Sequence, residues 1–403
     1  MELVQVLAMT KIKYSILALL IASYSAHPIA EACKDTADGH AASQELFWKR
    51  LEEIRSGRKY PDDVPRGTFE QHHKMEGYDT TFNYLVDVPV EYDPEKKMDL
   101  HVYLHGGVNY STVRLYPKQI RRLKRLTIED AISIYPSAWT SAKWWYESQS
   151  KNIVEIIKII KKRYNVDDNR VFLHGLSDGA GGVYYFASHR PTPFAGFIAL
   201  IGSPQVLRPK HNVFGKTFPG NFINKPIFAV NAKDDEFFPA KSVERLFATL
   251  NDNGADITFH TVTGNHFGMP WLVKEKQAYE GFVARHTRNP YPDSLYWQID
   301  EGGEFGRIHW LILNGTKGAV TESAVVATKT GNAVHLSSKN VASATLLISS
   351  DHFDLSQNVR VWSNEKLVFD QRITPDVRVL DKWFEADGDR SMLFAYELCL
   401  DAL

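Results

Sequence analysis

One stretch of this sequence joins an apolar strand directly to a serine that stands between two glycines. Residues 171–180 read Val-Phe-Leu-His-Gly-Leu-Ser-Asp-Gly-Ala, and the small and apolar residues that follow are compatible with a helix. Because Gly175 and Gly179 carry no Cβ, the strand and the helix can approach closely at a sharp turn that exposes the hydroxyl of Ser177. The pattern predicts a strand, a tight turn and a helix, with Ser177 as a nucleophile. A tight connection without chemistry is the alternative.

The segments around this turn alternate between short apolar strands and helices. We expect five strands, at residues 131–134, 170–173, 196–201, 226–230 and 257–262. We expect four helices, at residues 152–164, 179–188, 240–250 and 273–286. Such alternation requires crossover connections, and it predicts a mostly parallel sheet with helices on both faces. Before these segments, residues 82–89 and 100–104 are expected to form a hairpin, turned at Asp93 and Pro94, that adds an antiparallel edge.

The pattern changes after residue 290. Strands are expected at residues 308–313, 342–348 and 359–369, the last folded about Asn364 and Glu365. A late helix is expected to have Thr374 as its cap and Pro375 in its first turn. The expected fold class is therefore α/β, with a smaller C-terminal β-rich domain. We divide the chain into an N-terminal helical extension (33–80), the sheet with its helices (81–290) and the β-rich domain (291–403).

The first 32 residues have the pattern of a secretory signal peptide. Lys11 and Lys13 precede an apolar run at residues 14–22, and small residues follow as far as Ala32. The run is too short to span a membrane, so we expect cleavage near Ala32 and a secreted or periplasmic protein. An ordinary buried helix is the alternative.

The chain contains two cysteines, Cys33 and Cys399. In an exported protein they could form a disulfide bond that ties the two ends of the mature chain together. Two unpaired thiols, or a lipid anchor on Cys33, are the alternatives.

The overall charge limits the partners that the chain can have. There are 47 Lys and Arg residues against 48 Asp and Glu residues, a formal net charge of -1. This balance gives no electrostatic reason to expect binding to nucleic acid or to an anionic membrane surface. A small ligand with little or no charge fits better, and the serine chemistry expected here needs no metal or organic cofactor. The sequence does not indicate an oligomeric state.

Residues suited to activate Ser177 follow two of the expected strands. His266 comes just after the last strand of the sheet and Asp235 just after the strand before it, at the edge where parallel strands present site residues. The chain order serine, aspartate, histidine is typical of one class of Ser-His-Asp hydrolases. Asp235 stands four residues before Pro239, which favours it as the acid, and the adjacent Asp234 is the alternative.

A second glycine-containing segment closes an early strand. Residues 103–107 read Tyr-Leu-His-Gly-Gly, and the glycines would let the backbone approach a substrate closely. We expect the backbone N–H groups of Gly107 and Asp178 to stabilise the oxyanion of a tetrahedral intermediate. A tight turn that needs a positive φ is the alternative.

Together these segments resemble the α/β-hydrolase superfamily, in particular secreted phospholipase/carboxylesterase-type and prolyl-oligopeptidase-like esterases. The resemblance covers residues 82–286 and includes Asp-Asp-Asn-Arg-Val at residues 167–171, ahead of the serine turn. It implies hydrolysis of carboxylic esters through an acyl-enzyme, with Ser177 as nucleophile, His266 as base and Asp235 as orienting acid. The C-terminal domain resembles one attached to some bacterial predicted esterases, which implies no role for it.

Aromatic residues near the expected loops are candidates for substrate binding. They are Trp144, Trp145, Phe237 and Trp271, with packing in the hydrophobic core as the alternative. No cluster of Arg or Lys is evident beside Ser177. The expected substrate is therefore a neutral carboxylic ester on a small molecule or a polymer.

Two other functions fit the same residues. A serine peptidase of the prolyl-oligopeptidase type would use the same three side chains, although the chain lacks the long propeller that screens the substrates of that family. Alternatively, the hydrolase fold is inert and the C-terminal domain binds carbohydrate or a partner through Trp297, Trp310 and Trp362.

Overall fold

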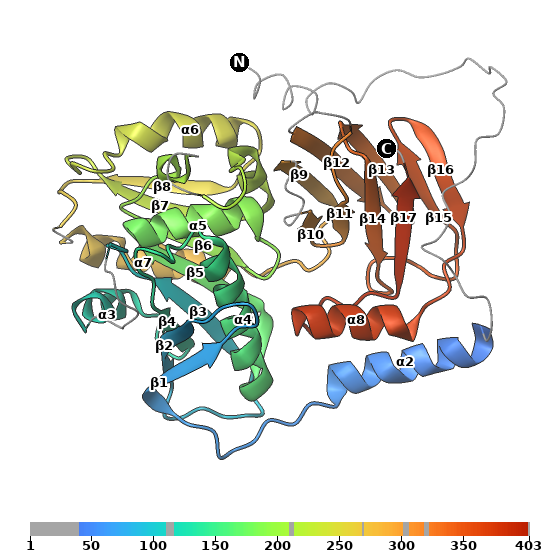
Figure 1. Cartoon of the computed structure of the whole chain (residues 1–403), viewed down its shortest axis with the longest axis horizontal. Helices are drawn as coiled ribbons and strands as arrows, with labels where there is room; N and C mark the ends of the chain where they lie inside the picture. The colour runs from blue at the N-terminus through green and yellow to red at the C-terminus, as the bar shows by residue number, and fades with distance from the viewer. Residues whose placement is uncertain are drawn as a thin grey trace.

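The computed structural model describes residues 40–109, 117–208, 213–267, 270–300, 306–317 and 322–401. Figure 1 shows two parts side by side, a sheet flanked by helices and a β-sandwich. The expected signal peptide and Cys33 lie outside the described residues, so the cleavage site and the pairing of Cys33 with Cys399 stay predictions. Within the described ranges, no helix is long and apolar enough to cross a membrane.

The first part is built on an eight-stranded sheet. Its strands lie in the order β1 (Gly67–Lys74), β2 (Thr81–Val88), β4 (Ile132–Pro136), β3 (Met98–Leu104), β5 (Val166–Leu176), β6 (Gly196–Leu200), β7 (Ile227–Ala232) and β8 (Ile257–Val262). Strands β3 to β8 pair in parallel, whereas β1 with β2 and β2 with β4 pair antiparallel. The central strands are buried on both faces, which explains their nearly continuous apolar sequences.

Helices cover both faces of this sheet. They are α3 (Pro117–Leu123), α4 (Glu147–Arg163), α5 (Asp178–His189), α6 (Lys241–Asp252) and α7 (Trp271–Arg285), with short 3-10 helices at Lys124–Leu126, Pro204–Leu207 and Pro219–Asn224. Helix α4 buries Ile153, Ile156, Ile157 and Ile160, which the helical period places on one face. This face packs with α5 and α6 in one apolar cluster, while α3 and α7 contribute to a second cluster. The arrangement confirms the predicted fold class.

The predicted hairpin between the first two expected strands is wrong. Strand β4 lies between β2 and β3, so these two strands are not neighbours. The antiparallel neighbour of β2 on its outer side is β1, which the sequence analysis missed. Its sequence, Gly-Thr-Phe-Glu-Gln-His-His-Lys, is mostly polar because β1 is an edge strand with alternate residues exposed.

The second part is a sandwich of two sheets. One has the order β16 (Lys366–Gln371), β15 (Val359–Ser363), β13 (Ala333–Lys339), β12 (Glu322–Thr330) and β9 (Ser294–Asp300). The other has the order β10 (Arg307–Ile308), β11 (Leu311–Leu313), β14 (Ser343–Ile348) and β17 (Tyr396–Asp401). The predicted turn at Asn364 and Glu365 is confirmed, with φ values of 46° and 71°. Both Trp297 and Trp310 are fully buried in the sandwich core, so neither side chain is exposed to bind the carbohydrate or partner considered in the sequence analysis.

The late helix α8 (Val377–Asp387) begins two residues later than predicted. Its cap is Asp376, not Thr374, and the Asp376 side chain accepts a hydrogen bond from the N–H of Arg378 at 2.8 Å. Aspartate is a favoured cap because its oxygen satisfies an amide that has no partner within the helix.

The N-terminal helix α2 (His40–Ser56) packs against the C-terminal part of the chain. Its buried residues Phe47, Leu51 and Ile54 form an apolar cluster with Leu380 of α8 and Leu393. In Figure 1, α2 lies along α8 beneath the sandwich. Residues 40–80 of the expected N-terminal extension therefore contribute to both parts, since α2 packs on the sandwich side and β1 joins the large sheet.

Buried charges join the two parts. Arg288 Nη1 lies 2.7 Å from Asp389 Oδ2, and the two side chains are 0% and 3% exposed. Lys161 Nζ of α4 lies 2.9 Å from a carboxylate oxygen of Asp168 and 3.7 Å from one of Asp389. Burial alone would raise the pKa of Asp389, but the charges of Arg288 and Lys161 outweigh that effect and hold this pKa far below its ordinary value.

We expect Asp389→Ala to lower the free energy of unfolding by about 3–5 kcal/mol, because it leaves Arg288 buried without its charged partner. Urea unfolding followed by circular dichroism measures the change. The control is Glu280→Ala, which removes one member of an exposed pair with Lys276 on α7 and should cost less than about 1 kcal/mol. Equally small effects from both variants would show that the buried pair does not stabilise the junction.

Candidate active site

Ser177 stands at the sharp turn between β5 and α5, as predicted. Its backbone has φ 58° and ψ −118°, a conformation that is strained for a residue with a side chain. A Cβ on Gly175 would lie 2.1 Å from the carbonyl oxygen of Gly179, and one on Gly179 would lie 2.0 Å from that of Leu104. Both glycines are therefore required for the turn to close, and the strain is held by the packed strand and helix on either side.

The structure brings Ser177, His266 and Asp235 into one hydrogen-bonded chain. Ser177 Oγ lies 2.8 Å from His266 Nε2, and His266 Nδ1 lies 2.8 Å from Asp235 Oδ2. Since the carboxylate can only accept, Nδ1 carries the proton and Nε2 is left to accept from the serine hydroxyl. The three residues follow the ends of β5, β8 and β7, which meet at one edge of the sheet.

Asp235, rather than Asp234, reaches the histidine. Asp235 is 2% exposed, and its Oδ1 accepts hydrogen bonds from the N–H groups of Phe237 and Phe238 at 2.9 and 2.8 Å. The side chain of Asp234 is exposed to solvent. The amides of Phe237 and Phe238 thus fix one carboxylate oxygen and aim the other at His266.

Gly106 and Gly107, which follow β3, lie against the serine. A Cβ on Gly106 would lie 2.8 Å from the Cβ of Ser177, and Gly107 has a φ of 66°. The carboxylate of Asp178 ties this loop to the start of α5, because its Oδ2 accepts from the N–H of Val108 at 3.0 Å. The close approach and the positive φ both require glycine here, so the expectation of a tight turn and that of a substrate-facing backbone are compatible.

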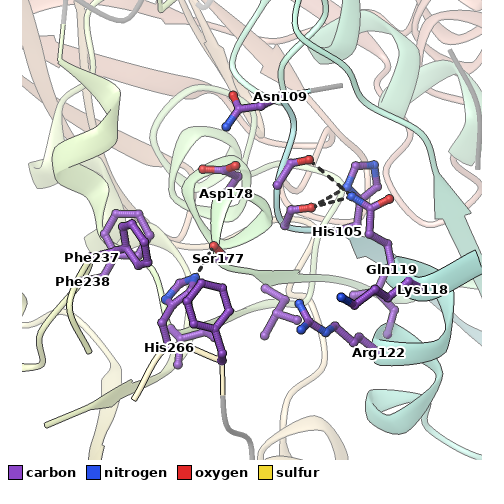
Figure 2. A pocket seen from close by; sticks show the side chains of 16 residues that line it. His105, Asn109, Lys118, Gln119, Arg122, Ser177, Asp178, Phe237, Phe238 and His266 are labelled. Carbon is purple, nitrogen blue, oxygen red and sulfur yellow. Dashed lines mark hydrogen bonds between the residues drawn. The ribbon is translucent and has the colours of Figure 1, made fainter. Parts of the chain in front are cut away.

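Two side chains hold the glycine loop: Gln119, which the sequence analysis missed, and Trp144, which it proposed as a substrate contact. Gln119 of α3 donates from Nε2 to the carbonyl oxygens of Gly106 and Gly107 at 2.9 and 3.3 Å (Figure 2). On the other side, Trp144 Nε1 donates to the carbonyl oxygen of His105 at 2.9 Å. Burial lowers the pKa of His105 to about 4, so this imidazole is neutral and supports the loop.

Ser177 opens into a cavity of about 370 Å³. Its described lining residues are His105, Gly106, Gly107, Asn109, Lys118, Gln119, Arg122, Leu123, Leu176, Ser177, Asp178, Ile201, Phe237, Phe238, His266 and Phe267. Three phenylalanines surround His266, with ring centroids 4.9 Å (Phe237), 5.7 Å (Phe238) and 5.3 Å (Phe267) away. On the other side of Ser177 are Lys118 and Arg122 of α3 (Figure 2). The expectation that no cluster of Arg or Lys stands beside the serine is therefore wrong, since both residues line the same cavity as Ser177.

Of the four aromatic residues proposed for substrate binding, Phe237 lines this cavity. Trp144, Trp145 and Trp271 are 0%, 4% and 4% exposed and pack in the hydrophobic cores. A Cβ on Gly182 of α5 would lie 2.6 Å from the Cβ of Trp144, which shows how closely that tryptophan packs against the helix. None of the three tryptophans is among the described lining residues of the cavity.

The described residues contain no group of three or more His, Cys, Asp or Glu side chains that could hold a metal ion.

Comparisons with known proteins give matches to esterases over part of the chain. No family model matches the sequence. A stretch of 127 residues is 28% identical to the bifunctional acetylxylan esterase/xylanase XynS20E of Neocallimastix patriciarum, and it covers 31% of this chain and 17% of that protein. Among solved structures, the chain is similar to a thermostable esterase (19% identity, TM-score 0.44, 55% of this chain and 63% of that one). It is also similar to a ferulic acid esterase (17% identity, TM-score 0.43, 54% of this chain and 97% of that one).

Proposed function

We propose that this protein is a serine hydrolase that cleaves carboxylic esters. The observation that carries the proposal is the hydrogen-bonded chain from Ser177 Oγ through His266 to Asp235, on a strained turn that faces a cavity. A hydroxyl is a weak nucleophile until a base at hydrogen-bonding distance can take its proton, and that base needs an orienting group on its far nitrogen. The 2.8 Å distances on both sides of His266 supply both conditions.

In the first half of the reaction, Ser177 Oγ attacks the ester carbonyl carbon while His266 Nε2 takes the hydroxyl proton. The new C–O bond pushes the carbonyl electrons onto oxygen, and the resulting oxyanion accepts hydrogen bonds from the N–H groups of Gly107 and Asp178. When the tetrahedral intermediate collapses, the bond to the alcohol oxygen breaks and His266 returns the proton to that oxygen. The alcohol leaves, and the acyl group remains on Ser177.

In the second half, water replaces the alcohol. His266 takes a proton from the water as its oxygen attacks the acyl carbon, and it then protonates Ser177 Oγ as the acid leaves. Asp235 keeps the imidazole in the tautomer that accepts at Nε2 and stabilises its positive charge in both steps. Each oxyanion donor is expected to lower the barrier by about 3 kcal/mol.

The alcohol or acyl part of the substrate belongs to a small molecule or a polymer. The name acetylxylan esterase, carried by the relative that matches 127 residues, supports a polysaccharide as one such polymer.

We also propose export directed by residues 1–32, which N-terminal sequencing of the mature protein tests. We further propose a domain boundary near residue 290, which is supported by separate apolar cores on either side of it.

A fluorophosphonate probe tests the proposed function directly. We expect it to attach to Ser177 in the intact protein, because the probe reacts with an activated serine and not with an ordinary hydroxyl. Mass spectrometry of the digested protein identifies the labelled residue. Absence of labelling, together with no hydrolysis of short-chain 4-nitrophenyl esters, would favour the inert-fold alternative.

A further inference from the structure

The cavity beside Ser177 has a positively charged side. Lys118 and Arg122 both belong to α3 and both line the cavity. They are four residues apart, so the helical period places them on the same face of the helix. Figure 2 shows their charged ends across Ser177 from Phe237 and Phe238. One wall of the cavity is thus aromatic and the opposite wall is cationic.

These two cations have no carboxylate partner among the described residues. Lys124, which follows α3, forms an ion pair with Asp87 at 3.2 Å, but no ion pair of the described chain includes Lys118 or Arg122. Asp178 is the one carboxylate among the described lining residues of the cavity, and its Oδ2 already accepts from the N–H of Val108. The positive charge on this wall is therefore available to a ligand.

The helix that carries the cations is fixed relative to the nucleophile. Gln119, between them in sequence, donates to the carbonyl oxygens of Gly106 and Gly107, the loop that lies against Ser177. Leu123, at the end of the helix, is 0% exposed in the apolar cluster under α3 and α7. Polar and apolar anchors thus hold the backbone of α3, which carries Lys118 and Arg122, in place beside the loop that contacts Ser177.

We propose that this wall binds a carboxylate group of the substrate. The preferred esters are then half-esters of dicarboxylic acids, or esters with a carboxylate on the alcohol part, and not neutral esters. The inference rests on the proposed ester hydrolysis and adds the class of substrate to it. A guanidinium matches the two oxygens of a carboxylate with two parallel hydrogen bonds, and an ammonium four residues away adds a second charge. The aromatic wall around His266 takes the apolar remainder of the molecule.

The experiment compares two matched pairs of esters. In the first pair the charge is on the acyl part: mono(4-nitrophenyl) adipate against 4-nitrophenyl hexanoate. In the second pair it is on the alcohol part: 4-acetoxybenzoate against 4-acetoxybenzamide. We expect kcat/KM of the full-length protein to favour the charged member of one pair by about tenfold or more, the amount typical of hydrogen bonds to charged groups. The pair that shows the preference identifies the part of the ester that carries the carboxylate.

Variants of α3 test whether these two side chains cause the preference. The double variant Lys118→Gln/Arg122→Gln should reduce the ratio of the two kcat/KM values to about one, mainly through KM of the charged ester. Arg122→Lys, which keeps the charge but loses the two parallel hydrogen bonds of the guanidinium, should give a ratio between those of the wild type and the double variant. The matched control is Arg121→Gln, which removes the same charge from an exposed residue of α3 outside the cavity lining and should leave the ratio unchanged.

The proposal would be overturned if neither pair showed a preference for the charged ester. It would also be overturned if a preference for the charged ester survived in the double variant. If the wild-type protein hydrolyses none of the four esters, the proposed function fails. Binding to the Ser177→Ala variant, measured by calorimetry, then tests the carboxylate site separately from ester hydrolysis. Tighter binding of 4-acetoxybenzoate than of 4-acetoxybenzamide, lost in the Lys118→Gln/Arg122→Gln background, would support the carboxylate site without catalysis. Equal binding of both compounds would contradict the site as well.

Discussion

Replacing Ser177 with alanine is expected to lower kcat for ester hydrolysis by about 10⁵–10⁶-fold. The substitution removes the atom that forms the acyl-enzyme, and the oxyanion donors and the cavity alone retain a small part of the rate enhancement. Hydrolysis of 4-nitrophenyl acetate by the purified protein measures the loss. The fold should persist, because alanine occupies less space than serine and the turn depends on Gly175 and Gly179.

The control for this substitution is Ser337→Ala, which removes an exposed hydroxyl from β13. It should have wild-type activity, and both variants should keep the wild-type circular dichroism spectrum. Turnover by Ser177→Ala within tenfold of the wild-type value would contradict the assignment of the nucleophile.

Asp235→Asn is expected to lower kcat by about 10⁴-fold. The asparagine keeps the shape of the side chain, and its oxygen can still accept from the amides of Phe237 and Phe238. Its NH₂ group would then face His266, favour the tautomer with the proton on Nε2, and so remove the base that Ser177 needs. Nothing would stabilise the imidazolium that forms during attack. The same 4-nitrophenyl acetate assay measures the effect.

Asp234 offers a matched control for this prediction. Asp234→Asn makes the same chemical change one residue earlier, on a side chain that is exposed to solvent, and should alter kcat by less than about twofold. Equal losses from the two variants would mean that the loop's net charge matters and that the contact between Asp235 and His266 does not.

The strands near the site could be predicted because they are buried on both faces. Residues 196–201 and 226–230 were predicted as strands and form β6 and β7 with bounds that differ by at most two residues, and the serine turn between β5 and α5 was predicted from its glycines. These segments carry their own signal, since burial on both faces requires an apolar run and a tight turn requires glycine. The approach of Ser177, Asp235 and His266 follows from the parallel order of β5, β7 and β8.

The parts that were missed depend on contacts between distant segments. Helix α3, Pro-Lys-Gln-Ile-Arg-Arg-Leu, has too few apolar positions to stand out, and the role of Gln119 becomes visible only once its carbonyl partners are in place. The order of β2, β4 and β3 could not be predicted from the sequence either. Two successive strands joined by a turn have the sequence pattern of a hairpin, whether or not a third strand lies between them. Trp144 and Trp145 were wrongly proposed as substrate contacts. Their burial depends on Gly181 and Gly182 of α5, which leave room for the two rings to pack, and the sequence does not show that these residues face each other.

Helix α2 connects the two ends of the described chain in a way that restricts how this protein can be divided. Its apolar face, formed by Phe47, Leu51 and Ile54, is covered by residues that come more than 300 positions later. A shortened version that stopped after α7 would expose that face to water and invite aggregation. Recombination at a single junction therefore cannot exchange the sandwich for another module, and any such exchange has to replace α2 at the same time.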